Sequence, residues 1–450
     1  MDRKQIKNRL FFWYTILWFF LLISLYISYF VYFVDTTSTK SKWVCLFSGA
    51  IAILFASCKI CELSFLKEEK NIFNNLKNNI LAYFTYKNQK NKILMFIIII
   101  FSLLFYKFFN LKILICFLSG LFFSYINSVI VFFINLVVYK KDNDSCVSNI
   151  KLTEAAIVNS SMAASLVSFG FLLSIIVILF HLFKDYQVLC FFVFGVSLSS
   201  FFENIVQVIT KKTVSNAQEF MFNFENNIEN ETVKKPLFLL NFLINNQINI
   251  VEFFKSISEA FSIILISAMI TGGCCFDLMG AFLPLIICTN GLFASIIALL
   301  LINLNKVKKN IKTFLSLQII AIVIFSILSF YTIHYWLYDF SFLIKVVVLG
   351  AFFGFISQFC NLDSIIDFFK PLQNISNSSC IGQNQVLTQS IKYGFRNVFL
   401  PLILMITFFI TSFIISQGSE NAVLGLFGCI LMTLSYCIIS CINSFINCYS

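Results

Sequence analysis

Charged residues are scarce in this chain: they make up 12% of its 450 residues, whereas 59% are hydrophobic. This composition excludes an ordinary water-soluble domain, because too few polar side chains are available to cover a surface. Histidine, glycine and proline are also rare, with 2, 15 and 4 copies. The two histidines, His181 and His334, lie far apart in the sequence, which argues against a histidine-based metal site.

Long apolar runs bounded by charged residues recur along the chain, and each is close to the length that crosses a bilayer as a helix. We therefore expect an all-α, polytopic bundle of about twelve transmembrane helices that forms a single domain over residues 1–450. Residues 1–58 would form N-terminal anchor helices. The expected spans are 10–34, 43–58, 94–109, 112–138, 156–183, 188–209, 257–277, 280–303, 313–332, 341–360, 385–416 and 421–446.

The basic residues predict the orientation of the chain in the membrane. Most of the 32 lysine and arginine residues fall in alternate connecting segments, which should face the cytosol. Both termini and the polar segments 210–256 and 361–396 are then cytosolic. The lipid bilayer is the expected partner, and anionic lipid accounts for the net charge of +11 without a nucleic-acid ligand.

Four charged residues fall at or near membrane depth and are candidates for function. Glu203 lies near the end of one expected span, where it could be an end-of-helix residue, and Glu259 lies near the start of the next. Asp277 and Lys345 fit better as interfacial or snorkelling residues.

A polar interval carries the strongest family signal. Residues 202–261 resemble, without a gap, the fifth and sixth helices of the membrane-integral pyrophosphatases, which couple pyrophosphate hydrolysis to H⁺ or Na⁺ pumping. In this resemblance Lys212 matches the lysine of the family's Thr-Lys-Ala-Ala motif, and Glu219 and Glu225 match two acidic positions. Asn246 keeps an asparagine of an aspartate-rich run. Glu259 and Ser256 occupy the positions of the family's ion gate.

A second interval agrees with the first. Residues 354–401 are similar to the family segment that runs through Pro-Val-Gln to a basic residue and a proline at the next helix. The coincident residues in this segment are Pro371, Gln373, Gly382, Gly394, Arg396 and Pro401. The resemblance covers most of the chain from about residue 60.

The departures from the family concern its metal ligands. The resemblance implies several Mg²⁺ ions as cofactors, and Mg²⁺ prefers carboxylate oxygens. The matching positions instead carry amides or hydroxyls, namely Ser215, Asn241, Asn245 and Asn249, with Asn374 and Asn377 in the second segment. An amide oxygen supplies no charge and accepts no proton, so metal binding in the family manner should fail. The resemblance still implies pyrophosphate and H⁺ or Na⁺ as partners.

By the resemblance, the chain ends in or just after the helix that precedes the family's last helices. We therefore expect it to be C-terminally truncated relative to the family.

The sequence leaves three readings open. The chain could be a divergent pump that takes missing helices from a second chain, or a degenerate pseudoenzyme that keeps the fold. It could also be an unrelated multi-pass transporter or channel, although no internal repeat is evident. The family resemblance further suggests a homodimer.

Overall fold

The computed structural model describes the greater part of the chain, and every described element is a helix. The described residues are 45, 48–56, 100, 110–142, 150–225, 231–304, 311–336, 341–365, 374–375, 377–378, 382–416, 418 and 421–442. Side chains are described for only part of these ranges. The all-α class expected from the apolar runs is confirmed for the described residues.

The first half of the bundle contains the helices that build the candidate site. They are α4 (Leu111–Asp142), α5 (Ile150–Phe183), α6 (Cys190–Glu225) and α7 (Glu231–Leu304). Two residues interrupt α7, because Phe276 and Asp277 have non-helical backbone angles and Asp277 has a φ of 53°. The break divides α7 into two helices at the point where one expected span, 257–277, ends and the next, 280–303, begins.

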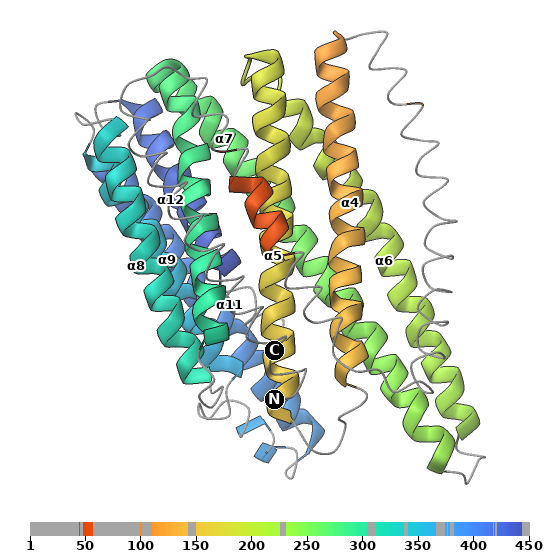
Figure 1. Ribbon diagram of the computed structural model, residues 1–450. Coiled ribbons are helices and arrows are strands. Elements are labelled where there is room, and N and C mark those ends of the chain that lie inside the picture. Colours follow the sequence, from red (N-terminus) through yellow and green to blue (C-terminus); the bar gives the residue numbers. More distant parts are fainter. Residues whose placement is uncertain are drawn as a thin grey trace, which may run out of the picture.

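The second half contains α8 (Ile311–Trp336), α9 (Phe342–Ile365), α11 (Gln383–Ile415) and α12 (Ala422–Ile442). In Figure 1, α8, α9, α11 and α12 lie to one side of α5, and α4 and α6 lie to the other. The central element is α7, which contacts α4, α5, α6, α8 and α12. Its two parts thus join the halves of the bundle.

Four helices among the described residues are long and apolar enough to cross a membrane, and the stretch within α7 is long enough for two crossings. These stretches are Leu111–Val131, Ala163–Phe183, Phe253–Ile297 and Ala422–Ile439. Shorter apolar stretches lie in α6, α8, α9 and α11. The expected spans from 112 onward therefore each coincide with a helix. The spans 10–34 and 94–109 lie outside the described residues, apart from Ile100, so the count of twelve stays a prediction.

Glycines allow two helix pairs to approach closely. A methyl group added to Gly120 of α4 would meet the backbone of Phe192 in α6, and one added to Gly195 would meet the backbone of Phe117. Gly350 and Gly354 of α9, four residues apart, face Met432, Ser435 and Ile439 of α12 in the same way. This spacing is the small-xxx-small pattern by which membrane helices pack backbone to backbone.

We expect Gly350→Ala to destabilise the bundle, because the new methyl group has no room against Met432. Overpacking of this kind costs about 1–3 kcal/mol. The matched control is Gly394→Ala in α11, where no described residue lies within 4 Å of the added carbon. Alanine stabilises a helix relative to glycine by roughly 0.5–1 kcal/mol, so the control should be neutral or stabilising. Thermal unfolding in detergent measures both, and equal effects would contradict the packing account.

Candidate functional site

Helices α6 and α7 extend well beyond their apolar stretches. At 1.5 Å per residue, the 36 residues of α6 span roughly 54 Å, compared with a hydrocarbon core of about 30 Å. The part of α7 that precedes its apolar stretch, residues 231–252, adds about 33 Å in the same way. The two helices contact each other, and Figure 1 shows them running together to the lower right edge of the bundle. The polar segment 210–256 is therefore mainly two helical extensions.

The positions that the resemblance assigns to pyrophosphate and metal lie on these extensions. Lys212 is an exposed residue of α6. Ser215, Glu219 and Glu225 follow it on α6, and Asn241, Asn245, Asn246 and Asn249 lie on α7. The side chains of these seven lie outside the described residues. Asn241, Asn245 and Asn249 recur every four residues, a spacing that keeps them near one face of a helix.

These positions do not fit Mg²⁺. Apart from the carboxylates of Glu219 and Glu225, the matched donors in the first segment are one hydroxyl and amides, and hard Mg²⁺ sites in proteins use carboxylates together with water and phosphate. Among the side chains that the structure describes, no group of three or more His, Cys, Asp or Glu could hold a metal ion.

The two ion-gate positions lie on α7 and are less buried than their polar neighbours there. Ser256 is exposed, and its hydroxyl donates to the carbonyl of Phe253 within its own helix. Glu259, one turn further along, is half-buried. By contrast, the neighbouring residues Lys255 and Ser258 are buried. Ser256 therefore faces away from these buried polar groups, whereas Glu259 lies one turn beyond Lys255, near the same side of the helix.

In the second segment, the structure describes three positions around the start of α11. The side-chain amide of Asn374 donates to the hydroxyl of Tyr393 at 2.9 Å, and Asn377 is exposed. Arg396 is a residue of α11, but its side chain lies outside the described residues. The contact between Asn374 and Tyr393 ties the segment before α11 to the helix itself.

A buried ion pair lies between α6 and α7. Lys255 Nζ is 3.2 Å from Glu203 Oε2, and the two side chains are only 3% and 2% exposed. The same ammonium donates to the Ser200 carbonyl at 2.9 Å and to the Asn204 side-chain oxygen at 3.4 Å. Three oxygens of one helix thus surround the Lys255 ammonium, which anchors α7 against α6.

Helix α4 adds further polar contacts to the ion pair between α6 and α7. The hydroxyl of Ser128 donates to Glu203 Oε2 at 2.9 Å, and the amide of Asn127 donates to Ser258 Oγ at 3.1 Å. Ser258 in turn donates to the carbonyl of Lys255 at 2.9 Å. We refer to Ser124, Asn127, Ser128, Glu203, Lys255 and Ser258 as the α4–α6–α7 polar cluster.

The Lys255 ammonium and the Glu203 carboxylate must be held as a pair because neither is favourable alone at this depth. Their Coulomb attraction at 3.2 Å is about 5 kcal/mol at an effective dielectric constant near 20, before the cost of removing both from water. Sequence reasoning noted Glu203 as a possible end-of-helix residue and assigned Lys255 to a cytosolic segment. The missed signal was a carboxylate and a lysine close to the ends of successive, antiparallel spans.

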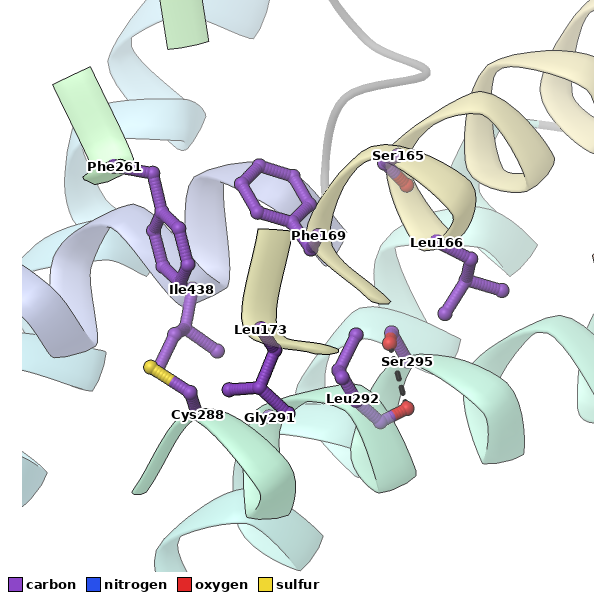
Figure 2. A pocket seen from close by; sticks show the side chains of 10 residues that line it. All are labelled: Ser165, Leu166, Phe169, Leu173, Phe261, Cys288, Gly291, Leu292, Ser295 and Ile438. Carbon is purple, nitrogen blue, oxygen red and sulfur yellow. Dashed lines mark hydrogen bonds between the residues drawn. The ribbon is translucent and has the colours of Figure 1, made fainter. Parts of the chain in front are cut away.

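A small, mainly apolar pocket lies among α5, α7 and α12. Figure 2 shows its lining, which includes Phe169, Phe261, Leu292 and Ile438. The hydroxyl of Ser295 is turned to the carbonyl of Leu292 in its own helix. The space has about the volume of one water molecule and a mainly apolar wall, so it is a packing defect of the core.

We expect Lys255→Met to destabilise the folded protein by about 3–5 kcal/mol, because it leaves the Glu203 carboxylate buried without its cation. The matched control is Lys345→Met on α9, where the lysine is exposed. That substitution should change stability by roughly 0.5 kcal/mol or less. Thermal unfolding of both variants in the same lipid or detergent makes the comparison. A Lys255→Met protein as stable as the control would show that the pair has no structural role.

Comparison with known proteins identifies the wider group to which these helices belong. The family model described as inorganic H⁺ pyrophosphatase matches residues 26–449. The chain is also 30% identical over 154 residues to a putative K⁺-stimulated pyrophosphate-energized sodium pump of Clostridium tetani (strain Massachusetts / E88). That match covers 33% of this chain and 22% of the relative, so the chain aligns with about a fifth of the relative's length. The family match excludes the reading as an unrelated transporter or channel: the chain belongs to the membrane-integral inorganic pyrophosphatase family.

Proposed function

We propose that this chain is a divergent membrane pyrophosphatase whose own residues do not hydrolyse pyrophosphate, and that it acts as a pyrophosphatase-like membrane scaffold. The observation that carries the proposal is the donor set along α6 and α7. Ser215, Asn241, Asn245 and Asn249 occupy consecutive stretches of two adjacent helices, at positions where the family resemblance places Mg²⁺ ligands.

The electrostatic argument supports loss of hydrolysis. Pyrophosphate carries several negative charges, and Mg²⁺ ions must neutralise them before water can attack phosphorus. Each carboxylate that contacts a cation at about 4 Å contributes roughly 4 kcal/mol per unit charge pair at an effective dielectric constant of 20. Neutral amides and hydroxyls at four such positions do not provide this attraction. Glu219 and Glu225 are the two matched acidic positions that remain on α6.

The fold is stabilised by contacts that do not involve the positions matched to metal ligands. The helices α9 and α12 pack through glycines, and the α4–α6–α7 polar cluster ties the long helices together. A protein that has lost catalysis can retain both, since they serve folding. We also propose, from the distribution of basic residues, that the extensions of α6 and α7 face the cytosol.

We expect the purified full chain, in lipid nanodiscs with Mg²⁺, to release no more phosphate from pyrophosphate than a Lys212→Ala variant does. Folding and monodispersity are checked on the same samples by thermal unfolding and size-exclusion chromatography. Because Lys212 is exposed on α6, its substitution should leave stability unchanged. The variant therefore measures the background release of phosphate by a folded protein.

Release of phosphate that disappears in Lys212→Ala would overturn the proposal. It would show that Glu219, Glu225 or a second copy of the chain rebuilds a working site. Thermal unfolding of a Ser215→Asp, Asn241→Asp, Asn245→Asp, Asn249→Asp variant, with and without Mg²⁺, asks whether restored carboxylates are enough for Mg²⁺ binding. We expect Mg²⁺ to raise the thermal stability of that variant and to leave the natural chain unchanged.

A further inference from the structure

We infer that the α4–α6–α7 polar cluster is a binding site for an internal water molecule at membrane depth, held by Ser124 and Asn127 of α4 beside the ion pair of Glu203 and Lys255. Ser124 Oγ and Asn127 Oδ1 are buried and have no hydrogen-bond partner among the residues that the structure describes. Their residues are only 4% and 2% exposed. Buried polar atoms of this kind are rare in folded proteins and are usually satisfied by ordered water.

Both groups are placed to share one ligand. Ser124 and Asn127 are three residues apart on α4, a spacing that brings side chains to about 5–6 Å on one face of a helix. Ser128, which donates to Glu203, is the next residue on that face. Asn127 already uses its amide group on Ser258, so its oxygen remains to accept a hydrogen bond. A water molecule can donate to this oxygen and exchange a second hydrogen bond with the Ser124 hydroxyl.

The charge of the cluster selects a neutral ligand. Glu203 and Lys255 balance each other at 3.2 Å, so the buried groups carry no net charge. A sodium or potassium ion added beside them would bring a net positive charge into a low-dielectric region and would face the Lys255 ammonium. Water supplies the missing donors without that penalty.

A bound water would extend the network from Ser124 through Asn127 and Ser258 to α7, which holds Ser256 away from the cluster and Glu259 one turn beyond Lys255. The water would thus make the cluster a hydrated polar site in the membrane interior, off the face that carries Ser256. This inference does not depend on whether pyrophosphate is hydrolysed, because it concerns only α4, α6 and α7.

The sign of one substitution tests the inference. If water is bound, Ser124→Ala removes one of its partners and lowers the melting temperature, by about 1–3 °C for a chain of this size. If the Ser124 hydroxyl is buried without a bound water molecule, Ser124→Ala removes an unpaired polar group and raises the melting temperature. The matched control is Ser119→Ala on the same helix, because that hydroxyl already donates to the Cys116 carbonyl at 2.7 Å. We express the Ser124 effect relative to that control.

A high-resolution cryo-electron microscopy map of the full chain in nanodiscs provides the second measurement. We expect a density peak about 2.6–3.2 Å from both Ser124 Oγ and Asn127 Oδ1. No peak in a map that shows other internal waters, or a rise in melting temperature for Ser124→Ala, would overturn the inference. A peak at shorter distances, together with stabilisation by Na⁺ or K⁺ but not by choline, would overturn it in favour of a cation site.

Discussion

The contact between Lys255 and Glu203 is the constraint on which the arrangement of α4, α6 and α7 depends. A charged side chain at membrane depth is unfavourable unless its partners are fixed in place. The Lys255 ammonium has three oxygens of α6 around it, and Ser128 of α4 holds the same carboxylate oxygen from the other side. Rotation of α7 by a fraction of a turn would break these contacts. The pair therefore fixes which face of α7 is buried.

The fixed orientation of α7 determines where the family-matched positions lie. Ser256 is exposed because Lys255, the preceding residue, is buried, and Glu259 is half-buried one turn further on. Continuity of α7 down to Glu231 then carries the same helix through Asn249, Asn245 and Asn241. A contact near the ends of the apolar stretches of α6 and α7 thus sets the register of the polar extension of α7. This extension can persist after its metal ligands are replaced.

The positions of the helices could largely be predicted from the sequence. Apolar runs of bilayer length are unambiguous, and the gap between spans 257–277 and 280–303 falls on the break at Phe276 and Asp277. Apolar periodicity indicated no helix over 210–225 and 231–256, because polar residues are frequent there; only the resemblance to the family's fifth and sixth helices indicated helices in these segments. Spans 10–34 and 94–109 and the orientation of the termini stay predictions.

The candidate site was only partly predictable. The resemblance located Lys212, Ser256 and Glu259, but it gave no reason to single out Lys255, which matches no motif quoted for the family. Its partner Glu203 is 52 positions away along the chain, and only the antiparallel packing of α6 and α7 brings the two together. Likewise, the hydrogen bond between Asn127 and Ser258 joins residues 131 positions apart. Contacts of this kind follow from tertiary packing, which local sequence patterns do not encode.

The most direct test of this account is a double-mutant cycle on the ion pair, with thermal unfolding of Glu203→Gln, Lys255→Met and the two combined in lipid nanodiscs. Each single change leaves a buried polar or charged group without its partner, whereas the double change removes both charges together. We expect the double variant to lose less stability than the sum of the two single losses, with a coupling energy of about 1–3 kcal/mol. Effects that simply add would show that Glu203 and Lys255 act independently, which would contradict the central role given to their contact.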